Sequence, residues 1–547
     1  MRSCILIIIL AACGNSTTGV GDDDDGVPPD SGPASRCVAT PSAPDDPDVV
    51  VTEAGEIRGT TGDTTRSFLG IPYAAPPSGD RRFRPTAQAE CWQGVRDATA
   101  FGNVCPQILP SGSKLGDEDC LFLNVWAPKT QSETKRPVML FIHGGAYELG
   151  SGNQDLVVDG TGNLYDGSTL AAEQNAIVVT FNYRLGALGF TAHPAFAVED
   201  DHGSSGNYGT FDQLAALHWI HDNIANFGGD PDRVMIFGES AGGLSVCLLL
   251  ATPLAKGLFS SAIMESGGCR VAEKQSRLQQ GVDLAARVGC DSDGDPAACL
   301  RSKSAFELTT QVAAEAGGMI GADPTKMWEM MHGPNLDGYL FTEQPIVSLR
   351  EGHHTKVPFV VGSNADEFEI FLPAITTCGG AYTFLYGVFG DRTNDVVAQY
   401  PCDWTAPRDS VVAAMTDHMF TCEARRAARA AVAGGSSSVR RYFFTHHFTN
   451  HALSALDSFH TAELPFVFRT FDVLGYTPTA ADTALSVDMG GYWGRIAASG
   501  DPNGGSAPAW PAYASSQDNV LDLDMPLAMT QQVRASHCDF WDTFVAQ

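Results

Sequence analysis

The chain has 547 residues, of which 44% are hydrophobic and 18% are charged, so it has enough apolar material for a large globular core. Its formal net charge of −30 argues against nucleic acid or an anionic membrane surface as a partner, because both repel an acidic protein. The 14 cysteines show no CxxC pair and no zinc-site spacing, which favours disulfides over a bound metal.

The chain opens with MRSCILIIILAACGNS, in which one basic residue precedes a short apolar run. The run is too short to cross a bilayer, so residues 1–12 are predicted to be a signal peptide. The small residues before Cys13 resemble a bacterial lipobox, which makes Cys13 the lipidated first residue of the mature protein. The expected location is a lipoprotein facing the periplasm or the cell surface, with a secreted protein as the alternative.

Residues 13–46 are rich in Gly, Pro, Ser and Asp and contain almost no large apolar residue. Such a segment cannot form a core, so it is predicted to be a flexible tether between the lipid anchor and the folded part. The anchor is the only membrane contact expected. Residues 47–547 show no linker and no repeat and are predicted to form a single domain.

Short apolar runs recur along this domain and alternate with helix-like segments such as TFDQLAALHWIHDNIANFGGD (210–230). The strand-like runs are VMLFIHG (138–144), AIVVTFNYR (176–184), VMIFG (234–238), SSAIMESGG (260–268), VPFVVGSNADE (357–367) and VRRYFFTH (439–446). Strands that are apolar on both faces and alternate with helices predict an α/β fold, with a large, mostly parallel sheet covered on both sides. In such folds, functional groups gather at the carboxyl ends of the strands.

The stretch GESAGG (238–243) contains the pattern G-x-S-x-G, which is not specific by itself in a chain with 57 glycines. Its context is informative, because it follows the predicted strand 234–238 and precedes a helix-like apolar stretch, 244–255, that stops near Pro253. A serine between small residues at a sharp strand-to-helix turn is typical of a nucleophile elbow. Ser240 is therefore the candidate nucleophile, and it needs a base, an orienting acid and an oxyanion hole.

The stretch HGGAYELGSG (143–152) follows another predicted strand and is a candidate oxyanion hole. Glycines at this place allow backbone N–H groups to converge on one point, so Gly145 and Ala146 are expected to bind a developing oxyanion. Ala241, directly after Ser240, is expected to supply a third N–H group to the same point.

Two further stretches supply candidates for the acid and the base. SNADEFEIF (363–371) ends a predicted strand and offers Asp366, Glu367 and Glu369, among which spacing alone does not choose. SFHTAELPFVF (458–468) places His460 at a transition from polar to buried sequence. The order serine, acid, histidine along the chain is that of α/β-hydrolases. Three histidines within 446–451 lack a carboxylate or cysteine arrangement and are expected to be structural or exposed rather than metal ligands.

Several long motifs resemble the type B carboxylesterases, the family that includes the cholinesterases. The motifs are RFRP (82–85), EDCLFLNVWAP (118–128), FNYRLGALGF (181–190), GNYGTFDQ (206–213), FGGDPDRVMIFGESAGG (227–243), the acidic pair at 366–367 and CDFWD (538–542). The resemblance covers nearly everything from about Val49 onward. It implies one α/β-hydrolase domain.

The resemblance also implies the chemistry. The acid is Glu367, although Phe368 stands where the family usually has glycine, and the base is His460. The expected activity is a serine carboxylesterase that acts on small-molecule esters, short-to-medium or bulky and neutral, through an acyl-enzyme on Ser240. No cofactor and no metal are implied.

Structural contacts follow from the same resemblance. The implied buried ion pairs are Arg184–Asp212 and Arg82–Glu118. The implied disulfides are Cys105–Cys120, Cys290–Cys299 and Cys422–Cys538. The leftover cysteines suggest two more bridges, Cys37–Cys91 and Cys378–Cys402, whereas Cys247 and Cys269 either pair or remain buried free thiols.

Two other functions compete with a carboxylesterase. One is a lipase for long acyl chains, which predicts activation at an oil–water interface, and no lid is marked in the sequence that would decide. The other is a non-enzymatic adhesion protein, since some members of this fold have lost the serine. The presence of a serine, an acid, a histidine and the oxyanion glycines together favours an enzyme.

The loop between Cys105 and Cys120 predicts how the enzyme treats choline esters. In the cholinesterases this loop is longer and carries a tryptophan that stacks on the choline cation, whereas here it reads PQILPSGSKLGDED, without an aromatic residue. Because a cation–π site is missing there, choline-ester activity is expected to be weak or absent. The measurement is kcat/KM for acetylthiocholine beside a neutral thioester, and a clear preference for acetylthiocholine would contradict the prediction.

Overall fold

The computed structural model describes Cys37 and residues 46–130, 132–153, 163–292, 294–316, 332–449 and 451–544. All of these residues belong to one compact unit, Cys37–Gln547. The predicted signal peptide, Cys13 and nearly all of the predicted tether lie outside the described residues. Among the helices that are described, none is both long and apolar enough to cross a membrane.

The fold is built on an 11-stranded sheet with the order β16-β15-β14-β13-β12-β11-β9-β10-β8-β4-β3. In the sheet order β10-β9-β11-β12-β13-β14-β15, each strand runs parallel to its neighbour. The pairs β15–β16 at one edge, and β10–β8, β8–β4 and β4–β3 toward the other, are antiparallel. The strands of this sheet are β3 (Thr60–Thr61), β4 (Thr65–Pro72), β8 (Phe122–Pro128), β9 (Arg136–Ile142), β10 (Ile177–Phe181), β11 (Gly229–Glu239), β12 (Ser261–Glu265), β13 (Phe359–Asn364), β14 (Val439–Phe444), β15 (Asn519–Leu523) and β16 (Ala528–Gln531). Two small sheets comprise β1 (Val49–Val51), β2 (Glu56–Arg58) and β5 (Val95–Asp97), and β6 (Gln107–Ile108) and β7 (Lys114–Leu115).

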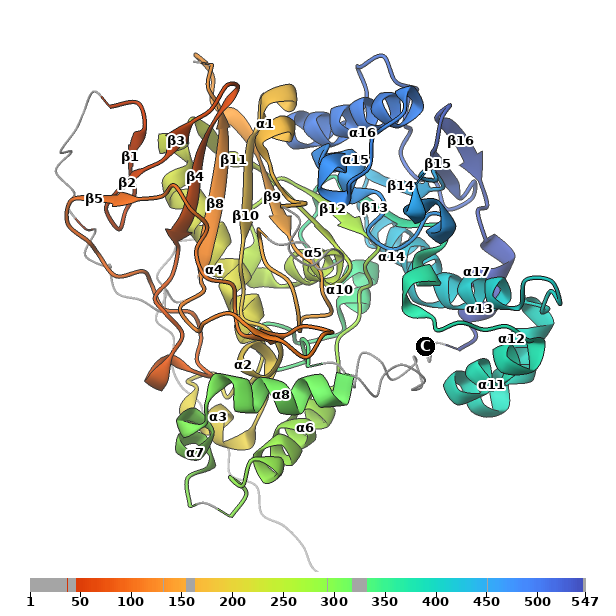
Figure 1. The fold of residues 1–547 in the computed structure, drawn as a ribbon, viewed down its shortest axis with the longest axis horizontal. Helices are drawn as coiled ribbons and strands as arrows, with labels where there is room; N and C mark the ends of the chain where they lie inside the picture. The colour runs from red at the N-terminus through yellow and green to blue at the C-terminus, as the bar shows by residue number, and fades with distance from the viewer. Residues whose placement is uncertain are drawn as a thin grey trace, which may run out of the picture. The chain divides into compact units, whose positions relative to one another are not determined.

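Helices connect and cover the strands (Figure 1). The described α-helices are α1 (Ser168–Gln174), α2 (Gly186–Phe190), α3 (Pro194–Glu199), α4 (Tyr208–Asn223), α5 (Ala241–Ala251), α6 (Lys274–Arg287), α7 (Pro296–Ser302), α8 (Ala305–Ala316), α10 (Pro345–Glu351), α11 (Cys378–Phe389), α12 (Thr393–Gln399), α13 (Pro407–Thr416), α14 (Cys422–Ala433), α15 (Leu464–Phe468), α16 (Ala480–Ser499) and α17 (Ala535–Trp541). In Figure 1, α6 to α8 gather at one end of the molecule and α11 to α13 at another.

Side chains of the central strands alternate between two hydrophobic clusters, one on each face of the sheet. In β9, Val138 and Leu140 pack into a cluster that includes residues of α4, α5 and α14. Met139 and Phe141 pack into the other cluster, with residues of α1, α15 and α16. This alternation follows from the two-residue period of a strand. Because both faces are covered, the strands read as continuous apolar runs in the sequence.

The predicted α/β fold, with a large, mostly parallel sheet and helices on both faces, is confirmed. The six predicted runs correspond to β9 through β14. Two boundaries differ: β11 begins at Gly229, before an irregularity in its ladder to β9, and the helix after Ser240 begins at Ala241 instead of near residue 244. Strands β3, β4, β8, β15 and β16 lie outside the predicted runs, and in β3, β4 and β16 exposed or half-buried polar residues interrupt the apolar pattern.

Six disulfides join twelve cysteines of the described residues. They are Cys37–Cys91, Cys105–Cys120, Cys247–Cys269, Cys290–Cys299, Cys378–Cys402 and Cys422–Cys538. Cys247 and Cys269, for which pairing was left open, are bonded to each other and fully buried, so the bridge ties α5 to the loop after β12. This many disulfides indicates folding in an oxidising compartment outside the cytoplasm.

A buried ion pair and a partly buried one fix loops of the fold. Arg184 forms a fork on Asp212, with Nε to Oδ2 and Nη2 to Oδ1 both at 2.8 Å, and the two side chains are 3% and 0% exposed. This pair joins the loop after β10 to α4. Arg82 likewise contacts both carboxylate oxygens of Glu118, and its Nη1 donates to the carbonyl of Arg301 at 2.9 Å.

Substituting Asp212→Asn is expected to lower the free energy of unfolding by about 3–5 kcal/mol, because Arg184 would keep its charge without a buried counter-charge. Denaturant titration measures this change. The matched control is Asp395→Asn, which breaks a pair with Arg392 whose side chains are 46% and 56% exposed and should cost less than about 1 kcal/mol. Equal losses of stability in the two variants would show that burial of an ion pair does not determine the cost of breaking it.

Candidate active site

Ser240 lies at the turn from β11 into α5, with φ 59° and ψ −121°. A non-glycine residue in this conformation is strained by roughly 1–3 kcal/mol. The second and third residues after it must be glycines: a Cβ on Gly242 would lie 1.9 Å from the carbonyl oxygen of Ile142, and one on Gly243 would lie 2.4 Å from that of Glu265. The Ser240 N–H donates to the same Glu265 carbonyl at 2.9 Å, which fixes the turn.

The loop after β9 lies beside this turn. A Cβ on Gly144 would lie 3.0 Å from the Cβ of Ser240, so only glycine allows the approach. Gly145 and Ala146 both have positive φ, 100° and 57°, which turns their backbone N–H groups away from regular pairing. Within the described residues, neither N–H group has a hydrogen-bond partner. The N–H of Ala241 is at the first position of α5, where a helix leaves its N–H groups unpaired.

The base of this loop is held by aromatic stacking. The ring of His143 stacks on Tyr183 with centroids 4.3 Å apart, and the Tyr183 hydroxyl donates to the His143 carbonyl at 2.8 Å. Burial lowers the pKa of His143 to about 4, so its ring is neutral at physiological pH. The loop is therefore fixed without adding a charge.

Of the three candidate acids, Glu367 contacts the histidine. Its Oε2 is 2.6 Å from Nδ1 of His460, and its Oε1 accepts the backbone N–H of Asn364 at 2.7 Å. Asp366 instead accepts the Ser458 N–H at 3.3 Å, and Glu369 pairs with Arg408.

Phe368, which departs from the family pattern, does not displace the acid. Its backbone N–H donates to Thr416 Oγ1 at 3.1 Å, and its ring lies 5.3 Å from Phe371. The larger side chain is packed against the cluster formed by α11, α13 and α17, so Glu367 keeps its contact with His460.

The second ring nitrogen of His460 faces a carboxylate that the sequence did not point out. Nε2 lies 3.0 Å from Oε1 of Glu239, the residue before Ser240, and within the described residues no hydrogen bond joins the imidazole to Ser240. Burial alone would lower the pKa of His460, but Glu239 and Glu367 outweigh it and raise the pKa well above its usual value. Burial in turn raises the pKa of Glu239.

Two aromatic rings pack against the imidazole of His460. The ring centroids of Phe420 and Phe371 lie 4.8 and 5.2 Å from that of His460. Phe420 belongs to a single π-helical turn, Asp417–Thr421, directly before α14. The spacing of this turn gives no signal in the sequence, so these residues were not predicted.

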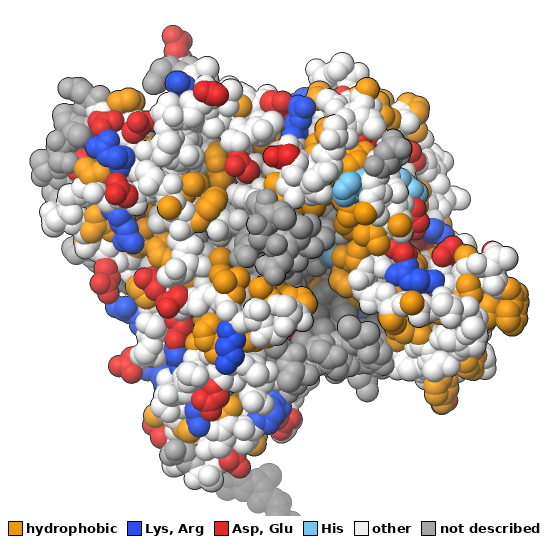
Figure 2. Space-filling view, viewed as in Figure 1, with side chains coloured by type: hydrophobic (Ala, Val, Ile, Leu, Met, Phe, Trp, Pro, Cys, Tyr) orange, Lys and Arg blue, Asp and Glu red, His pale blue; other side chains and the backbone are white. Residues whose placement is uncertain are grey.

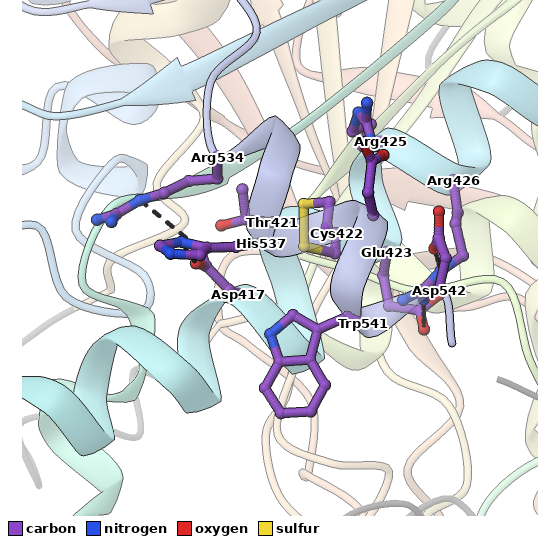
Figure 3. Close-up of a disulfide and its surroundings, with 12 residues drawn as sticks. Asp417, Thr421, Cys422, Glu423, Arg425, Arg426, Arg534, His537, Trp541 and Asp542 are labelled. Atoms are coloured by element: carbon purple, nitrogen blue, oxygen red, sulfur yellow. Dashed lines mark hydrogen bonds and ion pairs between the residues drawn. A yellow bond between two sulfur atoms is a disulfide. The ribbon is translucent and has the colours of Figure 1, made fainter. Parts of the chain in front are cut away.

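The π-helical turn is tied to the segment around α17, as Figure 3 shows. The disulfide Cys422–Cys538 joins the first residue of α14, directly after the turn, to α17. The buried carboxylate of Asp417 accepts from Tyr400 at 2.8 Å and lies 3.0 Å from Nδ1 of His537. Residues far along the chain therefore support the ring that packs on His460.

Metal binding has no support among the described residues, where no group of three or more His, Cys, Asp or Glu side chains is arranged to hold an ion. His446, one of the three clustered histidines, is nevertheless flanked by two carboxylates. Its Nδ1 lies 2.6 Å from Asp524, and its Nε2 lies 2.6 Å from Asp482. It cross-links β14, α16 and the loop after β15, which is a structural role.

Gly242→Ala tests the turn at Ser240. Because the new Cβ would collide with the Ile142 carbonyl, the variant is expected to lose about 100-fold or more in hydrolysis of p-nitrophenyl acetate and to melt at a lower temperature. The control is Gly294→Ala, where nothing lies within 4 Å of the added Cβ and wild-type behaviour is expected. A fully active Gly242→Ala enzyme would show that the close backbone approach is not required.

Comparison with known proteins identifies the family of the chain. The chain matches the carboxylesterase family over residues 46–381 and 395–541. It is 36% identical to fumonisin B1 esterase of Sphingopyxis macrogoltabida over 485 residues, covering 86% of this chain and 85% of that protein. It is 35% identical to para-nitrobenzyl esterase of Bacillus subtilis over 499 residues, covering 88% and 96%.

A solved structure of a PNB esterase superposes with a TM-score of 0.77 at 35% sequence identity, and the match covers 90% of this chain and 99% of that one. With the strained serine and the buried acid–histidine pair, it leads to one conclusion: the chain belongs to the carboxylesterase family and is a serine esterase that hydrolyses carboxylic esters.

Proposed function

We propose that Ser240, His460 and Glu367 form the catalytic triad of this esterase. The observation that carries the proposal is the buried 2.6 Å contact between Glu367 and Nδ1 of His460. Ser240 itself is strained and partly exposed. With Nδ1 bound to the acid, Nε2 is the nitrogen left to accept a proton. Catalysis requires Nε2 to move from Glu239 toward the serine hydroxyl. In enzymes of this kind, the hydrogen bond between base and nucleophile often shortens only when substrate is bound.

The reaction follows from these positions. His460 takes the proton of the Ser240 hydroxyl, and the serine oxygen attacks the ester carbonyl. The N–H groups of Gly145, Ala146 and Ala241 bind the oxyanion. His460 then gives its proton to the departing alcohol, and water, activated by the same imidazole, hydrolyses the acyl-enzyme.

The substrates proposed are neutral carboxylic esters with short-to-medium or bulky groups. Support comes from the aromatic rings of Phe371 and Phe420 beside His460 and from relatives whose names are fumonisin B1 esterase and para-nitrobenzyl esterase. Nucleic acid is not a proposed partner, and on the face in Figure 2 Lys and Arg side chains stand singly among Asp and Glu.

The location proposed is outside the cytoplasm, at a membrane, with the lipid on Cys13 as the only anchor and residues 13–46 as tether. Support comes from the lipobox-like LAAC sequence and the six disulfides.

A lipase is the second candidate, and one surface favours it. Helix α11 has no charged residue, and its outer face exposes Tyr382 and Tyr386, 41% and 53% exposed, with stacked rings. Trp404, near the Cys378–Cys402 bridge, is 83% exposed. Figure 2 shows hydrophobic side chains gathered over this part of the molecule, at the right of the view. Exposed tyrosine and tryptophan suit a boundary between water and lipid.

The test is hydrolysis of p-nitrophenyl acetate, butyrate and palmitate by wild type and by Ser240→Ala. Wild type is expected to turn over the short esters, and the variant to lose at least about 1,000-fold in kcat, because no other hydroxyl replaces the nucleophile. Preference for palmitate, with activation above its solubility limit, would instead identify a lipase. Equal inactivity of both proteins on every ester would favour the adhesion alternative.

A further inference from the structure

Three successive residues of the loop after β9 have a positive φ. The values are 100° for Gly145, 57° for Ala146 and 61° for Tyr147. Glycine adopts this conformation freely, whereas alanine and tyrosine keep it only where surrounding contacts hold them. Inside the loop, the carbonyl of Gly145 accepts the N–H groups of Glu148 and Leu149 at 3.0 and 2.9 Å. These bonds close the turn, but its position against α5 depends on contacts outside the loop.

The side chain of Tyr147 reaches from this loop to α5. Its hydroxyl lies 3.1 Å from Oγ of Ser245, and the two residues are 1% and 0% exposed. The ring packs on that of Phe190, with centroids 4.9 Å apart and planes at 60°. The backbone is held as well, because the N–H of Gly186 donates to the Tyr147 carbonyl at 2.6 Å. Tyr147 is therefore fixed at its backbone, its ring and its hydroxyl.

The other hydrogen bonds of Ser245 determine which hydroxyl is the donor. Oγ of Ser245 donates to the carbonyl of Ala241 at 3.0 Å and accepts from Nε2 of Gln213, in α4, at 2.9 Å. A serine hydroxyl has one proton and two acceptor sites. Because its proton lies on the Ala241 carbonyl, Tyr147 is the donor of the remaining bond. Burial raises the pKa of Tyr147, so its hydroxyl keeps the proton that it donates.

We propose that Tyr147 is a positioning residue, whose hydroxyl ties the loop after β9 to α5 through Ser245 and so keeps the N–H groups of the oxyanion hole converged. The proposal rests on the oxyanion hole assigned above.

The geometry gives the link this role because it completes a pair of contacts between the loop and one helix. Before the turn, the Ile142 carbonyl lies against Gly242 of α5, and after it Tyr147 bonds to Ser245 of the same helix. The two oxyanion donors of the loop, at 145 and 146, lie between these contacts. The third donor is at 241, the residue whose carbonyl Ser245 holds.

The link is expected to act on the transition state rather than on substrate binding. Negative charge on the ester oxygen develops only as Ser240 attacks, and N–H donors stabilise it best when they are already in place. Without the hydroxyl, the loop is held to α5 at one end only, so the donors at 145 and 146 are less well aligned. The kcat should then fall while KM changes little. A hydroxyl that only stabilised the fold would change neither constant.

The first experiment uses Tyr147→Phe, which keeps the ring and removes only the hydroxyl. The kcat for p-nitrophenyl acetate is expected to fall about tenfold, with KM within about twofold of the wild type. Affinity for phenylboronic acid, whose tetrahedral adduct on Ser240 mimics the oxyanion, should fall by the same factor as kcat.

The matched control is Tyr492→Phe, since Tyr492 is a buried tyrosine of α16 whose hydroxyl donates to the Pro508 carbonyl at 2.6 Å. This variant should melt at a lower temperature but keep the wild-type kcat and boronate affinity. An unchanged kcat and boronate affinity in Tyr147→Phe would overturn the proposal.

The second experiment combines Tyr147→Phe with Ser245→Ala. If the hydroxyl acts through Ser245, the double variant loses no more in kcat than the more impaired of the two single variants. Losses that multiply would show that the two residues act independently, which contradicts the proposal.

Denaturant titration of the same four proteins measures the link without any turnover. Losses of stability in the single variants that do not add in the double variant would support the link, and additive losses would overturn it. If the wild type hydrolyses no ester at all, the proposed function fails, and the titration still decides whether the hydroxyl joins the loop to α5.

Discussion

The arrangement of the site depends on the close approach of two backbones, Gly242 at the start of α5 and the Ile142 carbonyl at the end of β9. Because no side chain separates them, the N-terminus of α5 lies directly against the loop that follows β9. This one contact thus determines where Ser240 lies at the turn and how far Ala241 is from the loop at 143–147. The acid and the histidine are added from β13 and from the segment after β14, which the parallel ladder places on the same side.

Burial of carboxyls beside His460, the proposed base, is the second constraint. An imidazole needs a carboxylate to orient it, yet every further negative charge makes it harder for the ring to give up its proton. Glu239 also has a structural role. It is the last residue of β11, so its place in the strand determines where the following residue, the proposed nucleophile, begins the turn. Among the ion pairs of the described residues, no Lys or Arg offsets Glu239 or Glu367, and both carboxylates pair with His460.

Much of this could be predicted from sequence because the signals are local. The central strands are apolar on both faces, and the elbow, the oxyanion loop and the family motifs are contiguous stretches. Glu265 and Glu463 could not be placed in the same way, since strand register puts Glu265 opposite Glu239 and a turn before α15 positions Glu463. Phe420 depends on a π-helical turn with no sequence pattern. Glu463 had one available signal, its position three residues after His460 within SFHTAELPFVF.

The link between Asp417–Thr421 and the α17 segment bears on biosynthesis. Cys538 follows its partner Cys422 by 116 positions, and His537 and Trp541 come from the same late segment. A chain that emerges from its amino end presents Ser240 and the oxyanion loop long before the residues that brace Phe420 against His460. The packing around His460 is therefore expected to be completed only when this late segment docks on the rest of the fold.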